Sequence, residues 1–458
     1  MKRFPKHKPK GFTTTRIIAL GFLGAILAGT VLLMLPVSSA AGKMTDWVDA
    51  LFTATTSVCV TGLVTVPTYA HWSVFGQLII AILVQIGGLG VITFTTLFLI
   101  GLHKKIGLKE RLLIQDAYNL DTIQGMVVLV KRVTCGTLTV EGIGALLYMT
   151  VLIPKYGASG IWKSIFNAIS AFCNAGMDIL GPDSLEKYAA NPIINITTIL
   201  LIVLGGIGFP VWWDVLDMVR CRKKNYYNWP MALQHLRLHT KLALAMTAVL
   251  LLSGTLAVLI LEYTNPETIG NLPLWQKIQA SFFQSVTTRT AGFATISQAG
   301  MNKATVLICC MLMFIGGSPS GTAGGVKTTT IVILLVTVWA IIRGRKETEM
   351  FGRRVDGHIV RHALAIFTVS LLVMLAAVTA LSIVQPGDFL DCLYETMSAI
   401  ATVGLTRDFT PSLNVAGRIV IILTMYIGRI GPISLALLFN SKKYVNLKTY
   451  PTEKVSVG

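Results

Sequence analysis

Four short segments of the chain share a pattern that could present backbone oxygens to a cation. Each segment begins with an aromatic residue and reaches a glycine ten positions later; the segments are residues 52–62, 166–176, 282–292 and 394–404. The residues before each glycine differ widely in side chain, so a shared chemistry must come from the main chain. Rings of carbonyl oxygens can replace the water shell of a monovalent cation. The pattern therefore predicts a cation filter built from backbone.

The candidate filter residues are the glycine of each segment and the three residues before it. They are Cys59, Val60, Thr61 and Gly62; Cys173, Asn174, Ala175 and Gly176; Arg289, Thr290, Ala291 and Gly292; Ala401, Thr402, Val403 and Gly404. Glycine reaches backbone angles that other residues avoid, and a preceding helix would point its partly negative C-terminal end at the cation. A single such glycine is typical of an ordinary turn, but four glycines at spacings of 112 to 116 residues favour a repeat.

A second glycine recurs downstream of each filter segment. These glycines are Gly87, Gly205, Gly316 and Gly428, which follow the first set by 24 to 29 residues. Each repeat therefore reads as an apolar span, a short amphipathic segment that cannot cross a bilayer alone, the filter glycine and a returning span. Backbone that is not helical at membrane depth must line protein or water, which fits four re-entrant segments around one aqueous path.

Composition and charge indicate a multi-pass membrane protein. The 458 residues are 53% hydrophobic and only 13% charged, with long apolar runs. The net charge of +18 comes from five basic clusters beside the ends of apolar runs: residues 2–10, 104–111, 220–224, 343–354 and 442–448. This distribution follows the positive-inside rule, so we expect a plasma membrane location with both termini in the cytoplasm. The clusters favour lipid contact or partner docking over nucleic acid.

The expected fold is an all-α polytopic membrane protein with eight transmembrane spans in four helix–pore loop–helix repeats around a central pore. The expected divisions are a cytoplasmic N-terminus (1–15), repeat 1 (16–103), repeat 2 (104–220), repeat 3 (221–343), repeat 4 (344–441) and a cytoplasmic C-terminus (442–458). The seven cysteines are scattered and odd in number, so we expect no disulfide framework.

The returning span of repeat 3 has a composition that no continuous membrane helix would use. Its residues are Gly316, Gly317, Ser318, Pro319, Ser320, Gly321, Thr322, Ala323, Gly324 and Gly325, followed by Lys327. We expect a helix broken by an intramembrane loop over 316–325 that lies below the filter as a flexible obstacle. A phosphate-binding P-loop is disfavoured because Val326 separates the glycines from the lysine.

Two arginines stand out at membrane depth, where a charge is a functional hypothesis by default. Arg429 occupies the position that glycine holds in the other three repeats. Below a cation filter it could raise a barrier and act with the loop, or it could form a buried ion pair between repeats. Arg289 lies in a filter segment, and we expect its side chain to point back into protein towards Glu395. We expect structural roles for Glu141 and Asp214.

With these motifs the chain resembles the Trk/Ktr/HKT family of potassium transporters over almost its whole length, and the eight expected spans resemble the Ktr branch. The resemblance implies potassium binding by filter carbonyls at Gly62, Gly176, Gly292 and Gly404, and gating by the intramembrane loop. It also implies a homodimer and a cytoplasmic ring of nucleotide-binding RCK subunits. K+ is the expected transported ion and Na+ a candidate activator, with no organic cofactor in this chain. No repeat carries the TVGYG motif of potassium channels.

Two other classes of protein remain for comparison. A secondary transporter that couples potassium to sodium or protons would typically show two inverted repeats, whereas this chain has four parallel ones. A membrane enzyme would place clusters of His, Asp or Glu at membrane depth, whereas His103, His235, His239, His358 and His362 flank the expected cytoplasmic side. The sequence therefore favours a gated, channel-like path and predicts no enzymatic activity.

Overall fold

The computed structural model describes residues 14–102, 106–118, 125–223, 229–431, 451 and 453. The basic clusters at 2–10 and 442–448 lie outside the described residues, as does most of the predicted terminal segments 1–15 and 442–458. Within the described part of the chain, helices dominate and the only sheet has two short strands.

Each repeat begins with a long apolar helix. These four helices are α1 (Thr14–Met34), α7 (Met126–Tyr156), α12 (Leu238–Glu262) and α16 (Gly357–Val384). Each is apolar and long enough to cross a bilayer. The outer face of α12 is covered with exposed Val249, Leu252, Leu256 and Ile260, as expected for a surface that contacts lipid rather than water.

A shorter helix follows each long one and ends at the filter segment. These four pore helices are α2 (Trp47–Cys59), α8 (Ser159–Cys173), α13 (Leu274–Thr287) and α17 (Phe389–Ala401). With 13 to 15 residues each they are too short to span a membrane. Asp46 begins the first of them by accepting a hydrogen bond from the Val48 amide at 3.1 Å. α17 is buried on the face that carries Glu395 and Ser398, so it lies inside the bundle.

The returning spans are interrupted in three repeats, whereas the sequence predicts an interruption only in repeat 3. Repeat 1 returns through α4 (Val74–Leu89) and α5 (Val91–Gly101), which meet at 104°, and repeat 2 through α9 (Pro192–Gly206) and α10 (Phe209–Lys223), at 101°. Repeat 3 returns through α14 (Lys303–Phe314), a loop and α15 (Thr328–Ile342), and repeat 4 through α18 (Val415–Ile430). Repeats 1 and 2 therefore return through bent helix pairs, which the sequence analysis did not predict.

Glycines at positive φ cause both bends. Gly90 has φ +86° and Gly208 has φ +94°, a conformation that side chains with a Cβ rarely adopt. The chain turns there instead of continuing as a helix. The described residues therefore hold a broken returning span in each of three repeats, and the pattern is consistent with eight spans in total.

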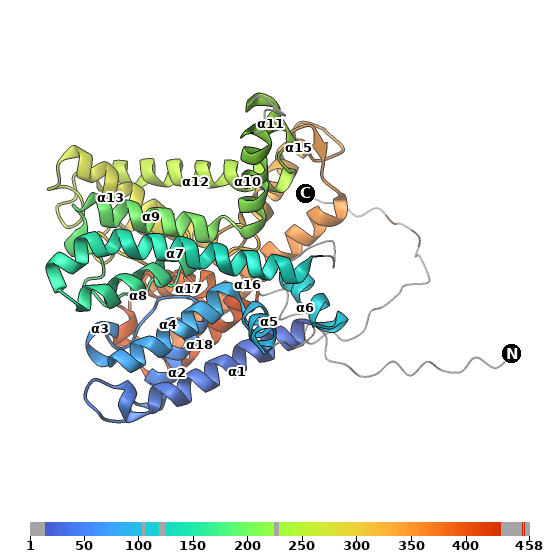
Figure 1. Cartoon of the computed structure of the whole chain (residues 1–458). Helices are drawn as coiled ribbons and strands as arrows, with labels where there is room; N and C mark the ends of the chain where they lie inside the picture. Colours follow the sequence, from blue (N-terminus) through green and yellow to red (C-terminus); the bar gives the residue numbers. More distant parts are fainter. Residues whose placement is uncertain are drawn as a thin grey trace.

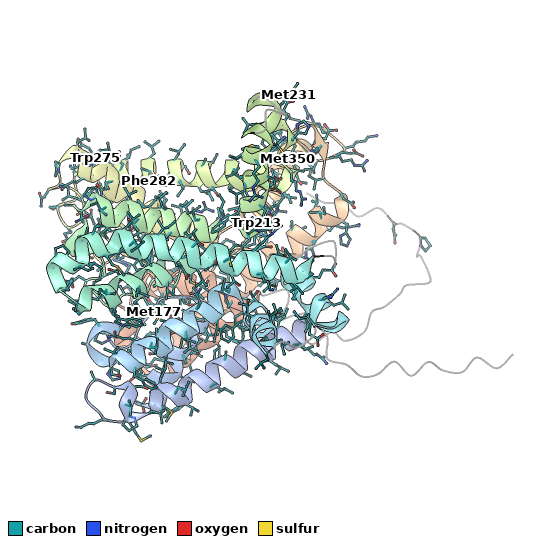
Figure 2. All side chains as sticks on the ribbon, in the orientation of Figure 1. Met177, Trp213, Met231, Trp275, Phe282 and Met350 are labelled. Atoms are coloured by element: carbon teal, nitrogen blue, oxygen red, sulfur yellow. The ribbon has the colours of Figure 1, made fainter. Side chains whose placement is uncertain are left out.

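The remaining elements are short and lie between these helices in the chain. They are η1 (Pro36–Ser38), α3 (Thr68–His71), α6 (Leu108–Tyr118), η2 (Glu186–Tyr188), α11 (Trp229–His235), β1 (Glu349–Met350), β2 (Arg353–Arg354) and η3 (Thr410–Ser412). α3 and α13 lie at one end of the bundle, and α10 and α11 at the other (Figure 1). Figure 2 shows Trp275 at the first end and Met231 and Met350 at the second.

Polar contacts join neighbouring repeats at the pore-helix end. Trp162 donates to Gln77 at 2.9 Å between repeats 2 and 1, and the Leu185 amide donates to the Ala294 carbonyl at 3.0 Å between repeats 2 and 3. Tyr394 donates to Gln298 at 2.9 Å between repeats 4 and 3. Arg418 and Asp49 join repeats 4 and 1 at 2.6 Å. The chain therefore closes on itself in the order 1–2–3–4.

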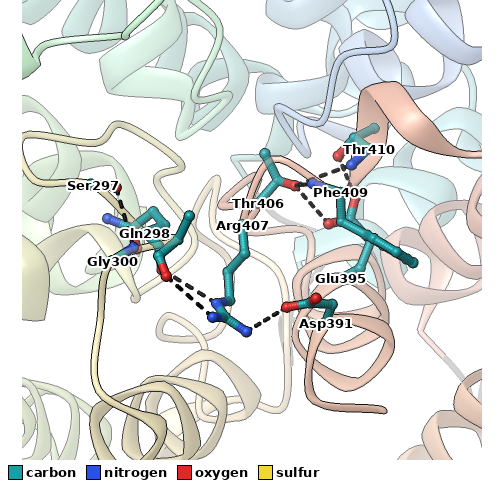
Figure 3. A network of polar contacts seen from close by, with 10 residues as sticks. Ser297, Gln298, Gly300, Asp391, Glu395, Thr406, Arg407, Phe409 and Thr410 are labelled. Atoms are coloured by element: carbon teal, nitrogen blue, oxygen red, sulfur yellow. Dashed lines mark hydrogen bonds and ion pairs between the residues drawn. The ribbon is translucent and has the colours of Figure 1, made fainter. Parts of the chain in front are cut away.

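Figure 3 shows the joint between repeats 3 and 4 in detail. Arg407 donates to the carbonyls of Gln298 and Ala299, at 3.4 and 3.2 Å, and forms an ion pair with Asp391. Asp391 lies thirteen residues before Gly404, as Asp49 lies thirteen before Gly62. Asp49 of α2 and Asp391 of α17 thus occupy the same position in their pore helices, and each binds an arginine that takes part in a joint between repeats.

Candidate functional site: a ring of filter strands above an intramembrane loop

All four filter segments leave their pore helices in the same way. The residue two positions before each glycine has a left-handed backbone: Val60 at φ 57°, Asn174 at 60°, Thr290 at 65° and Thr402 at 52°. In repeats 1, 2 and 4 the next amide bonds back to the carbonyl five residues earlier, as in Thr61 to Thr56 at 2.8 Å. This is a Schellman-type helix end. In repeat 3 the Ala291 amide bonds to Thr287 instead, at 2.9 Å.

The four filter glycines meet around one axis. A Cβ built on Gly62 would lie 2.5 Å from the Ala175 carbonyl oxygen of repeat 2, and one on Gly176 would lie 2.7 Å from the Ala291 oxygen of repeat 3. One on Gly292 would lie 2.5 Å from the Val403 oxygen, and Gly404 faces the Thr61 oxygen in the same way. Each glycine therefore packs against the carbonyl before the next glycine, which closes a ring that admits no side chain at these positions.

Three threonines add hydroxyl groups to the filter strands. Among the described residues, the buried Oγ1 atoms of Thr61, Thr290 and Thr402 have no hydrogen-bond partner. Buried hydroxyls are normally paired, so oxygens left unpaired beside a carbonyl ring are candidate ligands. Thr402 Oγ1 also lies against Gly324 of the loop, because a Cβ on that glycine would overlap it. The sequence interpretation, which relied on backbone alone, missed these hydroxyls.

The loop of repeat 3 folds back on itself between α14 and α15. The amide of Gly316 donates to the Val326 carbonyl at 3.0 Å, and that of Gly317 donates to Gly324 at 3.3 Å. Gly325, at φ 67°, turns the chain beside Gly316. Ser318 pairs with Thr328 through their hydroxyls at 3.1 Å. The loop is therefore a hydrogen-bonded fold that is anchored at both ends.

The tip of the loop is seated in repeat 2, where α9 breaks. The amides of Ser318 and Thr322 donate to the carbonyls of Gly206 and Gly205, at 2.9 and 3.1 Å. Thr322 Oγ1 donates to the Phe172 carbonyl at 3.2 Å. The remaining tip residues, Pro319, Ser320 and Gly321, lie along the same break, and the Phe209 amide donates to the Ser320 carbonyl at 3.1 Å. The bend at Gly208 thus makes room for the loop.

Three cationic side chains donate to carbonyls of the loop. Arg429 donates to Thr322 at 2.7 Å and also to Gly87 of repeat 1. Lys327 donates to Ala323 at 2.7 Å, and Arg289 reaches the Gly316 carbonyl at 3.5 Å. All three cations therefore act on loop main chain, which itself carries no charged side chain over 316–325.

The structure contradicts the expected contact of Arg289 with Glu395 and, of the two alternatives for Arg429, the buried ion pair. Arg429 bonds main-chain carbonyls, and within the described ranges it forms no ion pair. The side chain of Arg289 is buried, as expected, but its contact is Gly316 rather than Glu395. Glu395 instead accepts hydrogen bonds from Thr406, at 2.8 Å, and Thr410 (Figure 3). Hydroxyl donors satisfy this carboxyl group without a counter-charge.

A cavity of about 410 Å³ lies beside the loop, between α1, the α4–α5 bend, α16 and α18. Its lining includes Gly324, Ala401 and Gly428, together with the side chains of Lys327 and Arg429. The cavity therefore reaches from the lower edge of the filter strand of repeat 4 to the loop. It provides space for water beside the loop.

The second set of glycines brings the returning spans close to the pore helices. A Cβ on Gly87, Gly205 or Gly428 would overlap the carbonyl oxygen of Val58, Phe172 or Ile400, each in the last turn of a pore helix. In repeat 3, Gly316 meets Gly324 of the loop instead. Asp214 accepts a hydrogen bond from the Arg237 amide at 2.9 Å, which agrees with its expected structural role.

These features define a multi-pass membrane protein in which four repeats bring backbone carbonyls to one axis and one repeat places a loop near them. The family model TrkH, described as cation transport protein, matches residues 5–447. The chain therefore belongs to the TrkH family of cation transport proteins.

Curated relatives cover almost the whole chain. It is 43% identical to Ktr system potassium uptake protein B of Bacillus subtilis, over 98% of this chain and 97% of the relative. It is 39% identical to potassium/sodium uptake protein NtpJ of Enterococcus hirae, over 99% of each. Among solved structures, the potassium transporter TrkH from Vibrio parahaemolyticus matches with a TM-score of 0.73 at 17% identity, covering 95% of this chain and 86% of that one. This last likeness shows the fold.

Proposed function

We propose that the chain mediates potassium uptake across the cell membrane through a filter formed by the four glycine strands. The ring in which each filter glycine faces the carbonyl of the next repeat is the observation that carries this proposal. It is also supported by the names of relatives that match over nearly their full length, three of which are potassium uptake proteins of Ktr systems. The chain acts as a transporter and catalyses no covalent reaction.

The filter works by replacing the water shell of the ion. The carbonyl oxygens of Thr61, Ala175, Ala291 and Val403 supply a ring of neutral ligands, and the hydroxyls of Thr61, Thr290 and Thr402 add further oxygens. Each pore helix ends at this ring, so its partly negative C-terminus favours a cation there. Because the four filter glycines have no Cβ atom, their strands can approach one another closely enough to surround one ion.

The loop acts as the gate in this proposal. It is fixed to repeat 2 through Gly205 and Gly206 and held by the cationic side chains of Lys327 and Arg429. These two cations line the cavity next to the loop and would repel a potassium ion there. Conduction therefore requires the loop to leave repeat 2 and to break its contacts with Gly205, Gly206 and Arg429.

We also propose the cellular setting that the resemblance implies. The chain forms a homodimer in the plasma membrane, with both termini in the cytoplasm and an RCK-type nucleotide-binding ring docked on its basic end. Exposed Arg345, Arg353 and Arg354 support such docking, since they gather on the segment between α15 and α16. Na+ is a candidate activator, supported by the name of the Enterococcus relative. Coupled symport with sodium or protons is the alternative.

The experiment compares rubidium uptake in cells that lack their own potassium transporters. We expect the wild-type chain to restore growth at low potassium and to take up rubidium in preference to sodium. Gly404→Ser adds a side chain at φ 97° against the Thr61 carbonyl and should reduce this preference at least about tenfold. Gly24→Ser is the matched control, because no atom lies within 4 Å of a Cβ there. Equal selectivity in both variants would contradict the filter.

A further inference from the structure

A polar triad lies at membrane depth between repeats 1 and 2, behind the filter strand of repeat 2. It consists of Gln85 on α4, Glu141 on α7 and Cys173, the last residue of α8. Gln85 Nε2 donates to Glu141 Oε2 at 3.3 Å, and the Cys173 thiol lies 3.5 Å from Gln85 Oε1 and 3.8 Å from Glu141 Oε1. Glu141 is only 5% exposed and Cys173 is fully buried.

This triad has no counterpart in the other repeats. The residues two positions before Gly205, Gly316 and Gly428, where repeat 1 has Gln85, are Val203, Phe314 and Tyr426. The long helices α1 and α16 contain no acidic residue, and α12 has one only at its final position. A polar group in the middle of a membrane span is costly, so its placement beside a filter strand points to a role in transport.

The surroundings favour a neutral carboxyl group. Arg429 on α18 donates to the carbonyls of Gly87 and Thr322, and the described residues hold no ion pair to Glu141. Burying an unpaired carboxylate costs several kcal/mol, whereas a protonated carboxyl group needs only hydrogen-bond partners. Gln85 and Cys173 supply these partners.

The triad holds Cys173 at the point where the filter strand begins. On the other side of the sulfur, a Cβ on Gly88 would lie 2.5 Å from Cys173 Sγ, so repeat 1 packs directly against it. The next residue, Asn174, adopts the left-handed conformation that leads to the Ala175 carbonyl. A shift of Cys173 would therefore move one of the four ring carbonyls.

We propose that Glu141, as a neutral hydrogen-bonding group, is a positioning residue that sets the ion preference of the filter through Cys173. This inference rests on the proposed function, because it assigns a role within the same filter. It predicts that the hydrogen bonds of Glu141 matter for selectivity and that its charge does not.

The test measures rubidium uptake by purified protein in liposomes, with potassium or sodium as the competitor. Glu141→Met keeps the size of the side chain but removes its hydrogen bonds, and should lower the potassium-to-sodium preference about tenfold. Glu141→Gln keeps a neutral polar group and should remain within about twofold of wild type. Leu146→Met, on the exposed face of the same helix, is the control for substitution in α7.

Two results would overturn the proposal. One is a wild-type preference in Glu141→Met, and the other is an equal loss in Glu141→Gln and Glu141→Met, which would mean that the charge acts. If Glu141→Met does not fold, Cys173→Ala removes the thiol from the other side and should show the same loss of preference. A wild-type chain that takes up no rubidium would instead contradict the proposed function itself.

Discussion

At the scale of single residues, the main-chain carbonyls are the principal ligands of the proposed filter, and charged side chains contact the main chain of the loop. Arg429 joins the loop of repeat 3 to the returning span of repeat 1, through Thr322 and Gly87. A guanidinium can bridge two carbonyls in different directions, whereas an ammonium acts as a compact point charge. The type of cation at this position therefore matters as well as its charge.

Replacing Arg429 should release the loop. Arg429→Met removes two hydrogen bonds to carbonyls and a charge beside the cavity, so we expect potassium flux to rise several-fold without a change in ion preference. Arg429→Lys should fall between this variant and wild type. Rubidium flux into liposomes provides the measurement, with Arg220→Met on exposed α10 as a control. An unchanged flux in Arg429→Met would show that the Arg429 side chain does not hold the gate closed.

The contacts of single side chains could be predicted from the sequence only in part. The four glycines repeat in register, so their spacing predicts that their strands come together. The partners of Arg289 and Arg429 are carbonyls, which every residue carries, so residue types could not identify these contacts. Gln85 and Glu141 are isolated polar residues in apolar runs. Each can be recognised in the sequence as unusual, but the sequence does not show that the two side chains touch. That contact depends on how α4 and α7 pack.

At the scale of elements, the returning spans explain how a loop fits at membrane depth. The α9–α10 break exposes the carbonyls of Gly205 and Gly206, and the loop amides satisfy them. The sequence predicts the broken helix of repeat 3 from its glycines, serines and proline. It does not predict the bends at Gly90 and Gly208, because glycine inside an apolar run also occurs in straight membrane helices.

The bend at Gly208 offers a test of the loop seat. A Cβ at this position would lie 2.5 Å from the Pro319 carbonyl oxygen, so Gly208→Ala should displace the loop and raise potassium flux several-fold. Gly90→Ala carries a similar backbone penalty at φ 86°, but no atom lies within 4 Å of its Cβ. Flux assays on both variants compare the two bends. An equal response would assign the effect to backbone strain rather than to the loop.

At the scale of the whole molecule, four repeats of one chain form a ring that is closed by two kinds of joint. Two joints use arginine and an aspartate thirteen residues before a filter glycine, and the other two use neutral hydrogen bonds. The repeat period predicts the fourfold arrangement and its order in the chain. The residues that form the joints differ from repeat to repeat, so the repeat period does not predict them.

The joint between repeats 4 and 1 should contribute to stability. Asp49 accepts hydrogen bonds from Arg418 at 2.6 Å and from Thr65 at 2.7 Å, and both charged side chains are mostly buried. We expect Asp49→Asn and Arg418→Gln each to lower the unfolding free energy by about 1–3 kcal/mol. The double variant should lose less than the sum, by about 1 kcal/mol. Thermal unfolding in detergent measures this coupling, and additive losses would rule out a direct interaction.

The central claim is that four repeats coordinate one dehydrated ion through their main chain. The most direct measurement is anomalous diffraction from crystals of the protein grown in rubidium. We expect a peak on the axis within coordination distance of the carbonyls of Thr61, Ala175, Ala291 and Val403. Protein that transports rubidium but shows its only strong peaks away from this ring would contradict it.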